Sequence, residues 1–314
     1  MFGFNFNKKT LPVPALPSSG LSNGLIDAIC ASLGSRSIPT MPGAAQKAFQ
    51  LSVDPNAEAR DFIDVIESDE SLSARVLKIA NSVYFDRGKS SNTIEEAVIV
   101  IGLNELRCLL SATTLSEIFP SNQPLRTQLW ANDIATALIA RTLGARLLPN
   151  KQELLFLGGL MHDIGKLLLL QRLPAEYLEV AKRVENRGIE FVEAEHESFV
   201  FDHTEVGQLI GERWNFSAEL QSILRNHHRA FADLPSNDSQ FFVAGIVKAA
   251  DLIAHALGLG HGRGFHKLRS CSEVNLNQAW EYLNIPASDQ KALLDGAKRS
   301  FDTEYDLYAG KDAK

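Results

Sequence analysis

The stretch Leu157-Gly158-Gly159-Leu160-Met161-His162-Asp163-Ile164-Gly165-Lys166 is the part of the sequence that decides the fold. Its adjacent pair, His162-Asp163, offers an imidazole nitrogen and a carboxylate that together can bind one divalent metal ion. A single pair of this kind also occurs as a hydrogen-bonded interior pair without any ion. The rest of the chain must therefore show whether further ligands accompany it.

Further histidines and a carboxylate follow at intervals that fit successive helices. His203, the pair His227-His228 and Asp251 lie downstream, so four of the eight histidines belong to this series. Helical bundles build metal sites from inward side chains on facing helices, and imidazole with carboxylate suits Fe, Mn, Zn or Mg. Each residue alone is better explained as an interior histidine or a solvated helix end. Taken together, the series predicts a site for one or two divalent ions.

Apolar residues elsewhere recur at helical spacing, and strand patterns are almost absent. Thr93 and Glu96 form a capping box that starts one helix, and Gly102 is expected to end it before a second helix follows. Two helices around a glycine turn could form a DNA-binding helix-turn-helix. The second helix is apolar, however, with Arg107 as its only early base, so core packing is the favoured role.

A polar turn framed by Pro120 and Pro124 divides the chain. We predict an all-α fold, a multi-helix bundle of two packed helical lobes. The Gly-rich stretch 257–264 follows a helix rather than a strand, which favours a loop over a phosphate cradle. The expected segments are a flexible N-terminal arm (1–21), a first helical lobe (22–120), a second lobe with the metal pocket (125–260), and a loop with C-terminal helices that cap the second lobe (261–314).

Composition restricts the class of protein. The formal net charge of −7 lacks the basic excess that a general nucleic-acid-binding protein needs, so no nucleic-acid partner is expected. No membrane span or signal peptide is predicted, which makes the cytoplasm the expected location. Cys30, Cys108 and Cys271 are odd in number and widely spaced, which predicts neither a disulfide framework nor a zinc knuckle.

The order His-Asp, His, His-His, Asp, with Gly-Leu-Met-His-Asp-Ile-Gly-Lys around the first pair, resembles the HD superfamily of metal-dependent phosphohydrolases. Further stretches narrow the resemblance to the HDOD family, the HD-related output domain of bacterial signalling proteins. It covers about residues 22–260 and implies that the second lobe is HD-domain-like. The stretches are Ile38-Pro39-Thr40-Met41-Pro42, the segment from Ile66 to Ser82, Ala97-Val98-Ile99-Val100-Ile101-Gly102-Leu103, and Asp202-His203-Thr204-Glu205-Val206-Gly207.

The resemblance implies both ligands and catalytic residues. Asp163 would bridge two ions, and in a working hydrolase metal-bound water would attack phosphorus. Lys166 would then balance the charge on the phosphoryl oxygens, since it lies on the same face as His162 if one helix continues through both. Its alternative is an ordinary exposed lysine. The implied metal ligands are His162, Asp163, His203, His227, His228 and Asp251.

Two positions depart from the superfamily pattern. A further metal-binding His is expected on the helix before the His-Asp pair, and Asn132 stands there. Gln128 occupies the matching position of a Glu that metal-rich HD-GYP phosphodiesterases use one helical turn earlier. No Gly-Tyr-Pro follows His227-His228 either, so recognition of a cyclic dinucleotide in the HD-GYP manner is not expected.

Two functions therefore stay open. The favoured one is a bacterial signal-transduction output or scaffold protein with a degenerate metal pocket, non-catalytic and acting through a signalling protein partner or a small phosphate-containing ligand. The alternative is a metal-dependent phosphohydrolase, of the phosphodiesterase or nucleotidase kind, that uses the retained His and Asp cluster. No membrane partner is expected, and the sequence assigns no oligomeric state.

Overall fold

The computed structural model describes residues 20–34, 38–40, 43–54, 56–85, 88, 90–260 and 275–309. Within these residues all regular structure is helical and no strand occurs, which confirms the predicted all-α fold. Nearly all of the predicted N-terminal arm, the Gly-rich stretch after Gly260, and Cys271 lie outside the described residues. Cys30 and Cys108 are free thiols.

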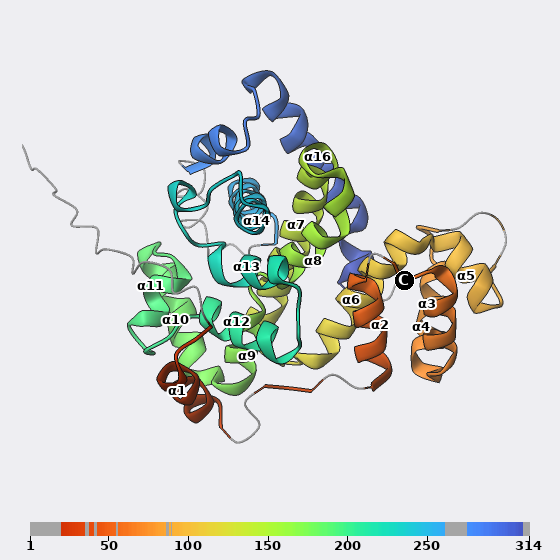
Figure 1. Ribbon diagram of the computed structural model, residues 1–314, viewed down its shortest axis with the longest axis horizontal. Helices are drawn as coiled ribbons and strands as arrows, with labels where there is room; N and C mark the ends of the chain where they lie inside the picture. Colours follow the sequence, from red (N-terminus) through yellow and green to blue (C-terminus); the bar gives the residue numbers. More distant parts are fainter. Residues whose placement is uncertain are drawn as a thin grey trace, which may run out of the picture.

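Five helices form a first group at one end of the molecule (Figure 1). Caps in the sequence mark where they begin: Asp69 accepts a hydrogen bond from the backbone N–H of Leu72, and Thr93 accepts one from Glu96. Gly102, at a φ of 83°, ends one helix as predicted, and the next helix runs at 104° to it. The five are α2 (Gly43–Val53), α3 (Ala59–Glu67), α4 (Glu70–Ala80), α5 (Ile94–Ile101) and α6 (Leu103–Ile118).

Arg107, the one early base of α6, is buried and does not face solvent. Its guanidinium donates hydrogen bonds to the backbone carbonyls of Leu51 at 2.8 Å, Asp54 at 2.6 Å and Ala57 at 2.7 Å. It also lies 5.1 Å from the ring centre of Phe62. These carbonyls belong to the end of α2 and the connection to α3, where backbone acceptors lack helical partners. Arg107 therefore ties α2 and α3 to α6, and the many buried residues of α6 confirm that this helix packs in the core.

The second group is built around the long helix α7 (Pro124–Leu147), which packs against α8, α14 and α16 (Figure 1). Every residue of α7 from Leu129 to Ala140 is buried. The contact with α8 is close because Gly159 faces α7, where a Cβ would lie 2.6 Å from the Cα of Ala137. The other helices of the group are α8 (Gln152–Met161), α9 (Ile164–Arg172), α10 (Pro174–Arg187), α11 (Phe191–His196), α12 (His203–Arg213), α13 (Ala218–Asn226) and α14 (Ser239–Leu257).

The first and last described helices take positions that their order in the chain does not predict. α1 (Asn23–Leu33), expected in the 22–120 lobe, lies below the second group and away from α2–α5 (Figure 1), and Arg213 at the end of α12 contacts Cys30 at 3.9 Å. α16 (Ala287–Tyr308) packs on α7, α6 and α14. Arg141 of α7 binds Glu105 of α6 and Tyr308 of α16, each at 3.1 Å. The C-terminal helix thus contacts both groups, and the division at Pro120–Pro124 falls in the turn between α6 and α7.

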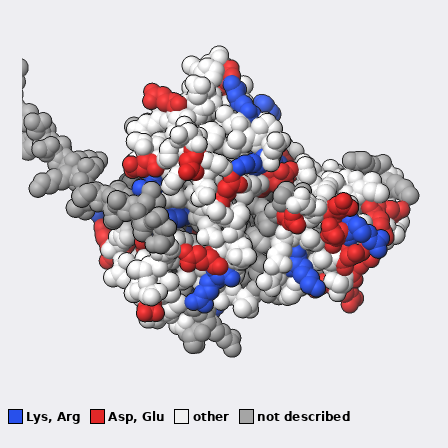
Figure 2. Space-filling model, in the orientation of Figure 1, with Lys and Arg blue, Asp and Glu red and all other residues white. Residues whose placement is uncertain are grey.

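One helix of the described residues, α14, is long and apolar enough on its own to cross a membrane by length and composition. Its apolar window is 67% buried inside the protein, and it carries Asp251 into the interior, as a core helix does. On the face drawn in Figure 2, Lys and Arg are interspersed with Asp and Glu and form no continuous basic surface.

Candidate metal centre

The His162-Asp163 pair lies in a break between two helices. α8 ends immediately before the pair and α9 begins immediately after it, so no single helix runs from His162 to Lys166 and the condition for a shared helical face is not met. Gly165 sets the geometry after the break, because a Cβ there would lie 2.0 Å from the carbonyl oxygen of His203. Only a glycine lets the start of α9 approach α12 this closely, which brings His203 beside Asp163.

The rings of His162 and His227 are oriented by the ends of their own helices. The Nδ1–H of His162 donates to the carbonyl of Gly159 at 2.7 Å, and that of His227 donates to the carbonyl of Ile223 at 3.0 Å. Both carbonyls belong to the last turns of their helices, and that of Ile223 also accepts the backbone N–H of His227 at 3.2 Å. With Nδ1 as the donor in each ring, Nε2 faces the centre and is free to bind a metal ion.

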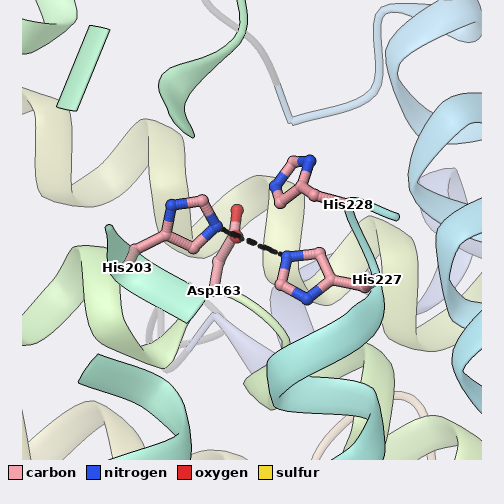
Figure 3. A group of neighbouring side chains, drawn as sticks. All are labelled: Asp163, His203, His227 and His228. Carbon is pink, nitrogen blue, oxygen red and sulfur yellow. Dashed lines mark hydrogen bonds and ion pairs between the residues drawn. The ribbon is translucent and has the colours of Figure 1, made fainter. Parts of the chain in front are cut away.

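Asp163 lies at the middle of the cluster, and its two oxygens have different neighbours. Oδ1 lies 3.2 Å from Nε2 of His203 and 3.4 Å from Nε2 of His227, and Figure 3 shows both rings turned toward this carboxylate with His228 beside them. Oδ2 accepts a hydrogen bond from Nζ of Lys166 at 2.6 Å. The Oδ1 side is therefore the one that a metal ion can share with two imidazoles.

The donor set on the Oδ1 side fits a divalent ion. Asp163, His203, His227 and His228 each offer one ligand atom, and all four atoms lie within 4.8 Å of one another. Asp163 Oδ1 and His228 Nε2 are buried without a hydrogen-bond partner, so the protein leaves them unsatisfied. Burial lowers the pKa of His227 to about 4 and also lowers that of His228, which keeps both rings in the neutral form that binds metals.

The opposite side of the pocket is filled by the protein's own donors. Asn132 donates its amide N–H to Oδ1 of Asp251 at 3.0 Å, and Thr136 donates its hydroxyl to the same oxygen at 3.4 Å. His255 lies 3.2 Å from that oxygen and His162 lies 3.6 Å from it. Asp251 is thus surrounded by donors at the place where the resemblance implies a metal ion.

The surroundings of Gln128 and the burial of Lys166 could not be predicted from the sequence. Gln128 is half-buried on α7, and no hydrogen bond joins it to the site among the described residues. Lys166 is 4% exposed, with its ammonium 4.3 Å from the ring centre of Phe191, so it is not an ordinary surface lysine. Its charge neutralises the Oδ2 side of Asp163.

Two buried carboxylates near the centre were missed by the sequence analysis. Glu195 of α11 is fully buried and binds the ring of His203 at 2.8 Å. Asp133 of α7 is also fully buried, 3.8 Å from Nδ1 of His162, and neither of its oxygens has a hydrogen-bond partner. Burial raises the pKa of Asp133 well above its usual range, which favours the neutral acid. In the sequence, each lies one helical turn after two apolar residues, Asp133 after Leu129 and Trp130, and Glu195 after Phe191 and Val192.

Without a bound ion, two rings of the cluster, His162 and His203, tend to be protonated. Burial opposes the charged form of His162, but the carboxylates around it, Asp163 first, raise its pKa to about 9. Burial likewise opposes the charged form of His203, and Glu195 and Asp163 raise its pKa to about 9. Binding of a divalent ion to Nε2 of His203 must therefore displace a proton from that ring.

A cavity of about 240 Å³ connects the centre with the surface. His227, His228 and Asp251 form part of its lining, and Phe231 and Lys248 form another part. The ammonium of Lys248 lies 5.4 Å from the ring centre of Phe231. A small molecule could therefore reach the metal side of the pocket from solvent.

These features define a helical protein with an HD-type His and Asp cluster, and the comparisons give the family. The HDOD domain model matches residues 38–230, more than half of the chain, so the chain belongs to the HDOD domain family. A relative from Treponema pallidum (strain Nichols), an uncharacterized protein, is 26% identical over 194 residues. The match spans 61% of this chain but only 37% of that relative.

Solved structures share the fold at low identity. A putative signal transduction protein from Marinobacter aquaeolei VT8 has a TM-score of 0.74 and 23% identity over 88% of this chain and 60% of its own. An HDOD domain protein of unknown function from Geobacter sulfurreducens has a TM-score of 0.69 and 22% identity, covering 86% and 92%. A putative phosphohydrolase from Shewanella amazonensis SB2B has a TM-score of 0.67 and 23% identity, covering 90% and 98%.

Proposed function

We propose that the protein is a non-catalytic output module of bacterial signalling that binds one divalent metal ion and acts in the cytoplasm through a protein partner. Relatives of the same fold include a putative signal transduction protein and a putative phosphohydrolase, so the fold itself does not choose between the two roles. The choice rests on the chemistry of the pocket in this chain.

One observation carries the proposal: the amide of Asn132 donates to Asp251 at 3.0 Å where a metal-binding imidazole is expected. A divalent ion there would meet the amide N–H of Asn132 directed at its carboxylate ligand, in place of the ring nitrogen that the superfamily pattern supplies at this position. Lys166 already neutralises the Asp163 oxygen on this side. Hydrolases with two metals stabilise the attacking and leaving oxygens with both ions, so the loss of one position removes that chemistry.

The ion that we propose would be held by Asp163, His203 and His227, with His228 beside them. Fe, Mn and Zn all suit this mixture of imidazole and carboxylate. When bound, the ion would supply positive charge and a Lewis-acid centre to a buried cluster, and it would stabilise the folded state by mass action. The residues themselves orient the ring nitrogens.

Metal content tests the proposal directly. We expect the purified, untagged protein to carry close to one equivalent of Fe, Mn or Zn by element-resolved mass spectrometry, and Asp163→Ala to carry none. Asn132→His should raise the metal content toward two equivalents, because it restores a ring nitrogen beside Asp251. Thr127→His, at an exposed position of the same helix, is the matched control and should change nothing. Two equivalents in the wild type, with hydrolysis of a phosphodiester such as bis(p-nitrophenyl) phosphate, would contradict the proposal.

The second candidate, a metal-dependent phosphohydrolase, is favoured by the cavity. Its lining reaches His227 and His228 and includes the cation of Lys248, so a small phosphate-containing ligand could approach a bound ion. Under this alternative Asp163 and Lys166 keep catalytic roles. Hydrolysis by the wild type that disappears in Asp163→Ala while helical content stays unchanged would establish it.

A further inference from the structure

Glu195 is bonded through both of its carboxylate oxygens beside the metal centre. Oε2 accepts hydrogen bonds from Nδ1–H of His203 at 2.8 Å and from the backbone N–H of the same residue at 2.9 Å. Oε1 accepts the hydroxyl proton of Tyr177 at 2.6 Å. All three residues are fully buried. Glu195 is therefore a partner of His203 rather than a ligand for the ion.

This partner distinguishes His203 from the other rings at the centre. His162 and His227 donate their Nδ1–H groups to neutral backbone carbonyls, whereas His203 donates to a carboxylate. A carboxylate fixes the tautomer of a histidine, orients its ring and makes the opposite nitrogen a stronger donor. That opposite nitrogen, Nε2 of His203, lies 3.2 Å from Oδ1 of Asp163, on the side proposed for the ion.

Tyr177 holds the carboxylate in place. It comes from α10, while Glu195 comes from α11 and His203 begins α12, so one chain of hydrogen bonds joins three helices. The ring of Tyr177 stacks on that of Phe191 at 6.3 Å between centres. The ammonium of Lys166 lies over the same Phe191 ring, 4.3 Å from its centre. The α10–α11 pair therefore supports both sides of Asp163, through His203 and through Lys166.

We propose that Glu195, held by Tyr177, is the positioning residue that sets the metal affinity and donor strength of His203. This inference rests on the proposed function, because it requires that the pocket bind an ion. It assigns to α10 and α11 a role at the centre although neither helix supplies a ligand.

The test compares Glu195→Gln and Tyr177→Phe with the wild type, using Zn²⁺ affinity measured by competition with a chromophoric chelator. Both substitutions keep the shape of the side chain. Glu205→Gln is the matched control, since Glu205 lies on α12 and binds Arg225 and the backbone of Asp202 but not the ring of His203. A second readout is the visible absorption spectrum of the Co²⁺-loaded protein, which reports the ligand field and is insensitive to loss of stability alone.

We expect Glu195→Gln to weaken Zn²⁺ binding about 10- to 100-fold and to shift the Co²⁺ spectrum, as removal of a carboxylate behind a metal-bound histidine does. Tyr177→Phe should weaken binding about tenfold, at the low end of that range, because the carboxylate stays in place. Glu205→Gln should match the wild type in both readouts. Wild-type affinity and spectrum in Glu195→Gln would overturn this inference alone. A wild-type protein that binds no Zn²⁺ or Co²⁺ would overturn the proposed metal binding and this inference together.

Discussion

The buried pair Lys166 and Asp163 allows a quantitative test of how the centre is held together without metal. Nζ lies 2.6 Å from Oδ2, and the two side chains are only 5% and 3% exposed. At an effective dielectric constant of about 20, two unit charges at this distance attract by about 6 kcal/mol. Desolvation of both groups offsets much of this attraction, and removal of one partner from a buried pair costs about 3 to 5 kcal/mol.

We therefore expect Asp163→Asn to lower the free energy of unfolding by about 3 to 5 kcal/mol, because it leaves the Lys166 ammonium buried without its carboxylate. Adding Lys166→Met should recover about 2 to 3 kcal/mol of this loss, and comparison with the single Lys166→Met variant then gives the coupling energy of the pair. Urea unfolding in the presence of a chelator, followed by circular dichroism and by tryptophan fluorescence, measures these values. Coincident transitions in the two signals show that the two-state treatment holds.

The chain offers a matched control for this cycle. Lys182 and Glu179 have the same three-residue spacing and a 2.5 Å contact, but their side chains are 63% and 59% exposed. Solvent screens this pair, so its coupling should be much weaker than that of the buried pair. If the single substitutions at 163 and 166 were additive within about 0.5 kcal/mol, the reasoning about this buried pair would be refuted.

Three further predictions concern other parts of the centre. Gly165→Ala should lower the free energy of unfolding by about 3 kcal/mol or more in urea, because its Cβ would lie 2.0 Å from the carbonyl of His203; Gly24→Ala, with no atom within 4 Å of its Cβ, should not destabilise. With chelator present, the protein should lose stability as pH rises from about 6.5 to 9. The reason is that folding raises the pKa values of His162 and His203 from 6.5 to about 9, so the stability that their protonated forms contribute is complete below this range and is lost across it. A melting temperature that does not change between these pH values would contradict this. Asp133→Asn should stabilise the metal-free protein at pH 8 but not at pH 3.5. Burial raises the pKa of Asp133, so the folded state disfavours the ionised carboxylate that is present at the higher pH. Equal melting temperatures of the variant and the wild type at pH 8 would contradict this prediction.

The helical fold and the convergence of the ligands were readable from the sequence for physical reasons. Apolar residues at helical spacing, caps such as Thr93 and the stop at Gly102 are local signals, and the structure reproduces them. The spacing of His203 and His227 after the His-Asp pair placed each on its own helix, so their meeting in one bundle followed from packing.

The break after His162 and the two missed carboxylates depend on contacts between distant segments. Nothing local interrupts the helix at His162, and the break becomes clear only when Gly165 meets the backbone of His203. A sequence signal for Glu195 did exist: it shares the buried face of its short helix with Phe191 and Ala194. A charged residue on such a face requires a partner, but the sequence does not say that the partner is a metal-binding ring.

The rings of His162 and His227 each donate a hydrogen bond to a carbonyl in the last turn of their own helix. Selection for a stable fold can therefore preserve these two histidines in a lineage that no longer needs a metal ion. Asn132 lies within α7 and binds no backbone group of its own helix end, so the same selection places less constraint on that position. When genomes are searched for active phosphohydrolases, the His-Asp and His-His motifs would then overcount them, and the residue at the position of Asn132 would be the more informative marker.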